Sequence, residues 1–402
     1  MCVKRVLGAW TAVAVVGLLA FSGMTSGKQD GKPVVNDDAW TVALYVCGDN
    51  DLESYWEGMS LAMLLNIPHS DGTDFVAYVD LMSTTETQIV EIDGGETFVI
   101  DTLPEMNFGD GATFQWFLTD VSTRFPSDKL AVVAWDHGSA WRGFCWDYTS
   151  DDHIQAREMR EAIVGAGVNI DILAFDACAC ASIEMVYEVA VTGFVDLMVA
   201  SEELVAGNGF PYDVMFTPVA IDPEKTSADV AFDMIDGWGA YYSEIGWGWY
   251  ATLGAIDVGV ISDNLESFNT WTTRMLAGLP NYLMDYRFAL RDSVWVSCVG
   301  HYQVDIVDLG KHLLAAPSTS QDAALVAATE EVMACVDQAV LRLYNPERKA
   351  DSCGLSIYWG FNNEQWRYYW EMYTTEISFA ADTSWGEFLI QYNLLTAGWY
   401  AV

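Results

Sequence analysis

Two segments carry the residue types best suited to covalent chemistry. The first, LAVVAWDHGSAWRG at residues 130–143, runs from apolar residues into His137. The second, IDILAFDACACASIE at residues 170–184, runs in the same way into Cys178. A thiol becomes a good nucleophile near neutral pH when a base or a positive charge lies beside it. The two segments therefore predict nucleophilic catalysis, with Cys178 as the nucleophile and His137 as its general base.

The residues beside this pair favour the same chemistry. Gly138 follows the histidine, and a glycine allows a substrate to come close to its backbone N–H. Together with the N–H of Cys178, that group could form an oxyanion hole, which holds the negative charge that develops on a carbonyl oxygen. A helix is expected soon after Cys178, and a helix N-terminus lowers the pKa of a nearby thiol.

Other interpretations of these residues stay open. A cysteine at a strand end is more often a small buried hydrophobe or half of a disulfide than a nucleophile. Cys178, Cys180, Cys145 and His137 could also bind zinc, although a Cys-x-Cys spacing fits a structural zinc site poorly. The chain has eight cysteines, and removal of Cys2 with an export signal leaves an odd number. At least one thiol then stays free, and the pairing of the others cannot be deduced.

The two segments belong to an alternation of short apolar runs and helical stretches. The runs are rich in Val, Ile and Leu, as expected for buried strands, and lie at residues 40–47, 74–80, 130–135, 170–175, 195–200, 250–257 and 354–359. Apolar residues at helical spacing occupy residues 52–66, 113–125, 156–166 and 182–191. This order predicts an α/β fold with a mainly parallel β-sheet flanked by helices, in which ligands bind at the carboxyl ends of the strands.

The N-terminus is typical of an export signal. Lys4 and Arg5 precede an uncharged apolar run at residues 6–21, and small residues suited to cleavage follow at 22–27. We therefore expect residues 1–27 to be a signal peptide and the protein to be secreted or otherwise extracytoplasmic. A membrane anchor that is not cleaved is the less favoured alternative, because the apolar run is short for a membrane span.

One compact domain is expected after this signal. Residues 28–38 are polar and indicate a short N-terminal arm. No composition shift divides the remaining residues 39–402, so we expect a catalytic core over about 39–260 and a C-terminal portion, mainly helical with a strand, over about 261–402.

The charge of the chain limits its partners. It has 57 acidic and 18 basic residues, which gives a net charge of −39. Nucleic acids and anionic membranes need Lys and Arg to displace their counterions, so neither is expected to be a stable partner. An acidic surface attracts cationic peptides or metal ions, although it can also serve solubility alone.

Several segments of the chain also resemble those of a known family. WDHGSAWRGFCWDYTSDD at residues 135–152 and DILAFDACACASIEMVYEVA at 171–190 are similar to the two active-site blocks of clostripain-family cysteine peptidases, which belong to the group of caspases, legumain and gingipains. Further similar blocks lie in the same order at residues 40–53, 200–213, 252–257 and 353–358. The resemblance therefore covers roughly residues 40–395.

The resemblance implies a caspase-like sheet and a cysteine endopeptidase that works through a thioester acyl-enzyme. It assigns the nucleophile to Cys178, the proton transfer to His137 and the oxyanion hole to the N–H groups of Gly138 and Cys178. Family members often prefer Arg or Lys before the scissile bond, which an acidic pocket explains. Asp176 matches the Asp two residues before the nucleophile, and Glu202, Glu203 and Asp213 are further pocket candidates.

Two more properties of relatives could apply. No cofactor is required by the chemistry, but some relatives need calcium, and the acidic turn Asp49-Asn50-Asp51 offers oxygen ligands. A solvated turn is the alternative, because no full ligand spacing is present. Some relatives also cut themselves between the two active-site blocks, which would place a cut within residues 148–160, where Arg157 and Arg160 lie.

Two other functions compete with an endopeptidase. One is a catalytically silent binding protein of the same fold. The other is a secreted carbohydrate-active enzyme, since the chain is rich in Trp and carboxylates, although no two carboxylates pair convincingly in the sequence.

Overall fold

A computed structural model describes residues 39–247, 251–295, 303–360 and 364–396. The expected signal peptide and the polar arm, residues 1–38, lie outside the described residues, as does Tyr250 at the start of one expected strand. None of the described helices combines the length and the apolar character needed to cross a lipid bilayer.

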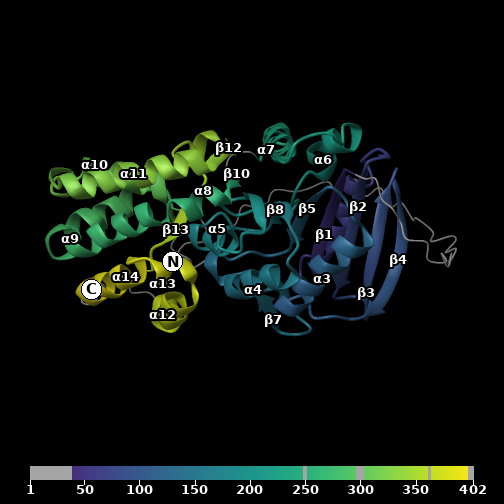
Figure 1. The fold of residues 1–402 in the computed structure, drawn as a ribbon, viewed down its shortest axis with the longest axis horizontal. Helices are drawn as coiled ribbons and strands as arrows, with labels where there is room; N and C mark the ends of the chain where they lie inside the picture. The colour runs from purple at the N-terminus through teal and green to yellow at the C-terminus, as the bar shows by residue number, and fades with distance from the viewer. Residues whose placement is uncertain (1–38, 248–250, 296–302, 361–363, 397–402) are drawn as a thin grey trace, which may run out of the picture. The chain divides into compact units, whose positions relative to one another are not determined.

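A nine-stranded mixed sheet forms the centre of the fold (Figure 1). Its strands, in spatial order, are β12 (Val340–Tyr344), β10 (Leu253–Asp257), β9 (Val195–Ala200), β8 (Ile170–Asp176), β5 (Lys129–Trp135), β1 (Trp40–Gly48), β2 (Thr73–Leu81), β3 (Glu86–Asp93) and β4 (Glu96–Pro104). The five central strands β9, β8, β5, β1 and β2 pair in parallel, as the sequence predicts.

The strands at both edges are antiparallel, so the sheet is mixed rather than mainly parallel throughout. β3 and β4 form a hairpin, and Gly94 and Gly95 both take positive φ angles at its tip. Glycines suit this tight turn because they adopt such angles without steric cost. β4 is mostly exposed and lacks the apolar run that identified the buried strands, so the sequence analysis missed this hairpin.

Helices cover both faces of the sheet (Figure 1). Alternate residues of each strand point to opposite faces, so Ala43, Tyr45 and Cys47 of β1 face one hydrophobic core while the residues between them face the other. The first core is completed by α3 (Gly111–Arg124), α4 (Ala156–Ala166), α5 (Ile183–Ala190) and α8 (Val258–Asp263). The second core is completed by α2 (Leu61–Leu64), α6 (Tyr212–Ile221) and α7 (Ser227–Glu244).

The expected helix over residues 52–66 is composite. It consists of α1 (Glu53–Tyr55), a π-helical turn η1 (Trp56–Ser60) and α2. Two short antiparallel pairs lie outside the main sheet, β6 (Phe144–Asp147) with β7 (Asp152–Ile154), and β11 (Gln303–Asp305) with β13 (Ser356–Tyr358).

The C-terminal portion is helical, as expected, and shares the first core. Its helices are α9 (Leu265–Asp292), α10 (Ile306–Ala315), α11 (Ala323–Ala339), α12 (Glu364–Glu376), α13 (Ser378–Asp382) and α14 (Trp385–Thr396). It also contains the 3₁₀ turns η3 (Thr319–Gln321) and η4 (Glu347–Lys349), whereas the 3₁₀ turn η2 (Ala140–Arg142) follows β5. β13 contacts the segment after Cys178, because the Ser356 N–H donates to the Ala181 carbonyl at 3.1 Å.

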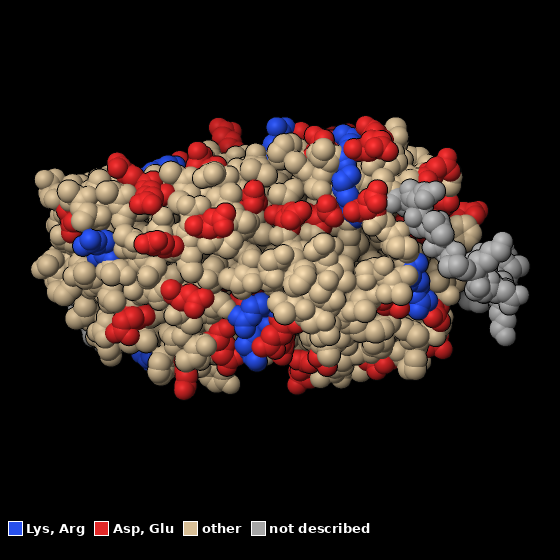
Figure 2. Space-filling view, viewed as in Figure 1, with Lys and Arg blue, Asp and Glu red and all other residues tan. Residues whose placement is uncertain are grey.

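The surface carries the charge imbalance of the sequence. Figure 2 shows acidic side chains over the visible face, with few basic ones among them. Several of the basic residues are held in ion pairs with this acidic excess, for example Arg342 with Asp236 and Lys225 with Asp233.

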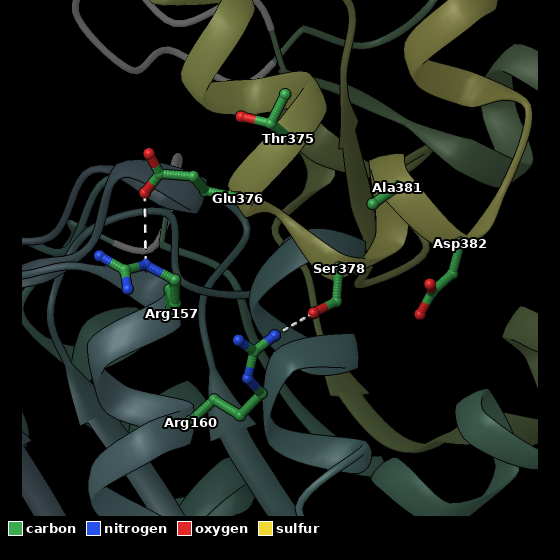
Figure 3. Close-up of a pocket in the computed structure, with 7 residues that line it drawn as sticks. All are labelled: Arg157, Arg160, Thr375, Glu376, Ser378, Ala381 and Asp382. Atoms are coloured by element: carbon green, nitrogen blue, oxygen red, sulfur yellow. Dashed lines mark hydrogen bonds and ion pairs between the residues drawn. The ribbon is translucent and has the colours of Figure 1, made fainter.

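Two arginines of α4 link that helix to the C-terminal portion (Figure 3). Arg157 pairs with Glu376 at 3.3 Å and with Glu161 on its own helix, and these side chains are partly exposed. Arg160 pairs at 2.8 Å with Glu188, whose carboxylate is fully buried and also accepts from the Ser378 N–H at 2.5 Å. Self-cleavage after either arginine stays a prediction, and it would require α4 to unwind first.

The two arginines allow a matched stability test. Arg160→Met should lower the free energy of unfolding by about 3 kcal/mol, because it leaves the buried carboxylate of Glu188 without its cation. Arg157→Met, on the same helix, removes only exposed pairs and should cost less than about 1 kcal/mol. Urea denaturation of both variants measures the difference, and equal losses would contradict a structural role for the buried pair.

Candidate active site

His137 and Cys178 follow neighbouring central strands at the same end of the sheet, where the carboxyl ends of the parallel strands lie. β5 and β8 pair in parallel, and Trp135 opposite Asp176 is their last registered pair. His137 and Cys178 each lie two residues beyond this pair in their own segment. The two segments stay paired for one more residue, because the Asp136 N–H donates to the Asp176 carbonyl at 3.3 Å. The carboxyl ends of parallel strands are where ligands bind in α/β sheets.

Gly138 is in close contact with the backbone of Cys178. A side-chain carbon at position 138 would lie 2.3 Å from the carbonyl oxygen and 2.7 Å from the nitrogen of Cys178. No side chain fits there unless the two segments separate. The glycine that follows the histidine is therefore required by the packing of the two segments, in addition to any access it gives to a substrate.

The backbone around both residues is strained. Ala179, directly after Cys178, has a φ of +59°, and Ala140 and Cys145, in the segment after His137, have φ of +50° and +57°. Non-glycine residues seldom adopt such angles, and when they do the strain tends to occur at functional sites. The N–H of Ala179 is held by the Glu203 carbonyl at 2.9 Å, which keeps the turn that presents the thiol in place.

The thiol of Cys178 is free but covered. Its sulfur accepts a hydrogen bond from the Val205 N–H at 3.3 Å and lies 3.7 Å from the Val205 carbonyl oxygen. Burial raises its pKa to about 11, and the nearby carboxylates of Asp176 and Glu203 act in the same direction. In this conformation the group is a thiol, and the segment after β9 lies against it.

The expected help from a helix N-terminus is not present. Cys178 precedes α5, but that helix begins at Ile183 with Ser182 as its N-cap, four residues beyond Cys178. The effect of a helix dipole on a thiol fades within about one turn, so burial dominates and the pKa rises.

The imidazole of His137 is oriented by Asp51. Nε2 lies 3.0 Å from Asp51 Oδ1, and the Tyr148 hydroxyl donates to the same oxygen at 2.9 Å. The hydrogen bond to His137 is the main cause of a lowered pKa for Asp51. The imidazole is about one-third exposed, so a substrate can reach it. Asp51 and Tyr148 were not identified as site residues from the sequence, where Asp51 stood out only as part of an acidic turn.

Asp136 holds the strand end behind the histidine. Its carboxylate is buried and accepts hydrogen bonds from the Asn50 amide at 2.7 Å and from the Trp146 N–H. The Cys145 N–H donates to the His137 carbonyl at 3.2 Å. The segment at residues 145–148 therefore fixes both the backbone of His137 and, through Tyr148, the partner of its imidazole.

Asp176, the first pocket candidate, is buried beneath the strand end. Its Oδ2 accepts from the Phe210 N–H and from the Tyr212 hydroxyl, both at 2.9 Å. Gly209 packs against it so closely that a side-chain carbon there would lie 2.7 Å from Oδ2. Burial raises the pKa of Asp176 to about 7.

The other pocket candidates have separate neighbours. Glu203 pairs with Lys349 at 2.5 Å. Glu202 is buried beside Asp305; burial raises the pKa of Glu202 well above its usual range, and Asp305 adds to this rise. Asp213 lies in the first turn of α6 and accepts from Asn66 at 3.3 Å. The described contacts do not bring these three carboxylates together.

Four carboxylates form a separate cluster that could hold a metal ion. The oxygen atoms of Asp49, Asp80, Glu105 and Asp147 lie within 4.8 Å of one another. Asp49 Oδ1 and Asp80 Oδ2 are buried without a hydrogen-bond partner, while Glu105 is exposed. Burial, followed by the charge of Asp147, raises the pKa of Asp80 to about 8. Hard oxygen ligands of this kind suit Ca²⁺.

The cluster differs from the turn expected to bind calcium, because only Asp49 of that turn takes part. The Asn50 amide contacts Asp136, and Asp51 contacts His137. The set of Cys178, Cys180, Cys145 and His137 is not among the ligand groups that the described residues bring together, which leaves the zinc interpretation without geometric support.

The titration of Asp176 gives a testable pH dependence. Its folded-state pKa of about 7 lies above the ordinary value, so the folded protein binds a proton that the unfolded chain has lost between pH about 4 and 7. Stability from this group therefore falls as pH rises across that window. Asp176→Asn keeps an oxygen that can accept both hydrogen bonds but cannot ionise.

Between pH about 4 and 7, the free energy of unfolding of Asp176→Asn should rise relative to that of wild type by up to about 1.4 kcal/mol per pH unit. Above pH 7 the difference should stay constant, and denaturation of both proteins at several pH values measures it. Parallel stability curves for the two proteins would contradict a carboxyl group that titrates near pH 7.

A sequence profile described as the clostripain family matches residues 44–392. Clostripain from Hathewaya histolytica is 27% identical over 132 residues, which cover 28% of this chain and 24% of that protein. The aligned stretch thus spans about a quarter of that relative.

Solved structures share the fold. A secreted cysteine protease from Bacteroides thetaiotaomicron, in complex with an irreversible peptide inhibitor, has a TM-score of 0.66 at 17% identity, covering 87% of this chain and 99% of that chain. An inactive zymogen protease from Parabacteroides distasonis has a TM-score of 0.67 at 17% identity, with the same coverage of both chains.

Proposed function

Since the chain belongs to the clostripain family of cysteine peptidases, we propose that it is an endopeptidase with Cys178 as nucleophile and His137 as general base. The observation that carries this proposal is the register of β5 and β8, which brings both residues to one sheet edge with Gly138 against the Cys178 backbone. A free thiol just after β8 and a partly exposed imidazole just after β5 supply the two groups that the reaction needs.

The proposed reaction proceeds through a thioester. His137 takes the thiol proton as the sulfur of Cys178 attacks the carbonyl carbon, and the N–H groups of Gly138 and Cys178 stabilise the oxyanion. The C–N bond then breaks, and His137 returns the proton to the departing amine. Water, losing its proton to His137, hydrolyses the thioester and restores the thiol.

The thiol must first leave its hydrogen bonds to Val205. An extended substrate backbone has the same N–H and carbonyl groups as Val205, so it can replace them beside Cys178. Asp51 keeps the imidazole oriented through its hydrogen bond to Nε2.

A preference for Arg or Lys before the scissile bond is part of the proposal. The supporting feature is Asp176, a carboxyl group two residues before the nucleophile whose pKa is about 7, so that an incoming guanidinium would favour its ionised form. Glu202 and Glu203 are weaker candidates because one is buried beside Asp305 and the other pairs with Lys349. Asp213 is partly exposed on α6 and stays a candidate for a more distant subsite.

Hydrolysis of fluorogenic peptides tests the assignment. A panel with Arg, Lys, Asp, Asn or Leu before the cut should show the highest kcat/KM for Arg or Lys. Cys178→Ala and His137→Ala should each lower kcat/KM by at least about 1,000-fold, because each removes a reacting group. Cys180→Ala, two residues from the nucleophile, is the matched control and should keep most of the activity.

The same panel separates the competing functions. If wild type hydrolyses no peptide and a thiol-reactive probe fails to label Cys178, the catalytically silent binding protein becomes the better account. Hydrolysis that survives in Cys178→Ala would place the nucleophile elsewhere. Activity on glycosides that iodoacetamide does not inhibit would favour the carbohydrate-active enzyme.

We also propose that the substrate is a peptide or protein, and that the enzyme is exported. The apolar N-terminal segment supports export, and one structural neighbour is described as secreted. A net charge of −39 is consistent with no stable nucleic-acid or membrane partner. The chemistry of the dyad requires no cofactor.

Calcium is proposed as a structural ion at the four-carboxylate cluster. The two buried, unpartnered oxygens of Asp49 and Asp80 fit a cation, since buried anionic oxygens are costly without one. When bound, the ion would neutralise the cluster and hold the ends of β1, β2 and β6 together. It would not take part in the chemistry of Cys178.

Thermal unfolding tests this site. Wild type should gain several degrees in Tm in millimolar calcium chloride relative to a chelator, because an ion that binds only the folded state stabilises it. Asp80→Asn should lose this gain, whereas Asp71→Asn, which changes a fully exposed carboxylate, should keep it. A calcium response that is equal in wild type and Asp80→Asn would move the ion to another site.

A further inference from the structure

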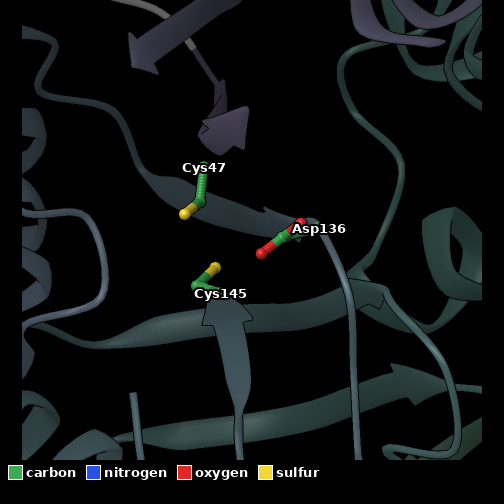
Figure 4. Close-up of side chains that lie close together, drawn as sticks. All are labelled: Cys47, Asp136 and Cys145. Carbon is green, nitrogen blue, oxygen red and sulfur yellow. The ribbon is translucent and has the colours of Figure 1, made fainter. Parts of the chain in front are cut away.

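Two buried cysteines that the proposed chemistry does not use face each other behind the histidine segment (Figure 4). Cys47 lies near the end of β1, and Cys145 lies in β6. Their sulfur atoms and a carboxylate oxygen of Asp136 all lie within 4.8 Å of one another, and the two thiols interact directly. Both side chains are completely buried.

We propose that Cys47 and Cys145 are a disulfide-forming pair whose bond locks the histidine segment to the central sheet. Figure 4 shows the two sulfur atoms directed toward each other from different segments, so a small movement of the two side chains would bring them to bonding distance. The proposal rests on the export proposed above, since disulfides persist in oxidising compartments.

The oxidant is a small-molecule disulfide, R–S–S–R. The thiolate of one cysteine attacks it, forming a mixed disulfide and releasing one R–SH. The thiolate of the second cysteine then attacks the sulfur of the first and releases another R–SH. The two cysteines together lose two protons and two electrons, and the small disulfide is reduced to two thiols. Because both sulfurs are buried in the folded protein, the exchange belongs to folding, before the segments close.

The bond would connect the two sides of the His137–Asp51 pair. On one side, the Cys145 N–H holds the His137 carbonyl, and Tyr148 follows three residues later to contact Asp51. On the other side, the carbonyl of Cys47 accepts from the Asn50 amide at 3.1 Å, in the turn that carries Asp51. A covalent link between the two cysteines therefore restrains the backbone on both sides of the imidazole.

The remaining described cysteines provide internal controls. Cys178, Cys335 and Cys353 are also free thiols, and the nucleophile among them must stay reduced for the proposed function. The sulfur atoms of Cys47 and Cys145 lie within 4.8 Å of each other, at a completely buried position. Oxidation should therefore be selective for this pair.

The test is a peptide map of the full chain produced in the bacterial periplasm and refolded in a glutathione redox buffer. After denaturation in excess iodoacetamide and proteolysis, Cys47 and Cys145 should occur in one cross-linked peptide and become alkylated only after reduction. Cys335 should be alkylated without reduction. Alkylation of both Cys47 and Cys145 without prior reduction would overturn the proposal. This readout needs no activity, so it fails or succeeds independently of the peptidase assignment.

A stability measurement gives a second, independent outcome. Wild type refolded with a reductant should have a Tm about 5 °C below the oxidised form, because the bond closes a loop of nearly a hundred residues. The double variant Cys47→Ala/Cys145→Ala should show no dependence on reductant, whereas Cys335→Ala should respond as wild type does. A wild-type Tm that is the same in both redox states would also overturn the proposal.

Discussion

The parallel pairing of β5 with β8 is the constraint on which the rest of the site depends. It sets the residues after Trp135 and Asp176 side by side, so His137 and Cys178, 41 residues apart in the chain, follow neighbouring strands at the same end of the sheet. The contact of Gly138 with the Cys178 backbone leaves no room for a side chain, and the positive φ of Ala179 stores strain in the same turn. The strained turn that presents the thiol is thus fixed to the ends of two paired central strands.

Buried carboxylates surround this edge, and each is satisfied in a different way. Asp136 is held by backbone and amide donors, Asp176 by Phe210 and Tyr212, and Glu203 by Lys349. Asp49 and Asp80 keep oxygens without partners within a cluster of four carboxylates, which is why we propose a cation there. The carboxylates of Asp176 and Glu203 add to the effect of burial and oppose ionisation of the Cys178 thiol in this conformation.

The sequence was sufficient to predict the five central strands, the helices beside them and the two strand ends that carry His137 and Cys178. Buried parallel strands are continuous apolar runs, and such runs are visible without a structure. The β3–β4 hairpin was missed because β4 is exposed, and the roles of Asp51, Tyr148 and Val205 were missed because each reaches the site from a distant loop. Asp80, Glu105 and Asp147 join Asp49 only after folding, so no local spacing could identify the cluster.

The central claim, that His137 activates Cys178, is tested most directly by the rate of covalent inactivation with a peptidyl chloromethyl ketone as pH is varied. The account predicts that wild type is modified at Cys178 alone, and that His137→Ala is modified far more slowly at neutral pH. Equal rates and equal pH profiles for the two proteins, or a label on any other cysteine, would contradict it.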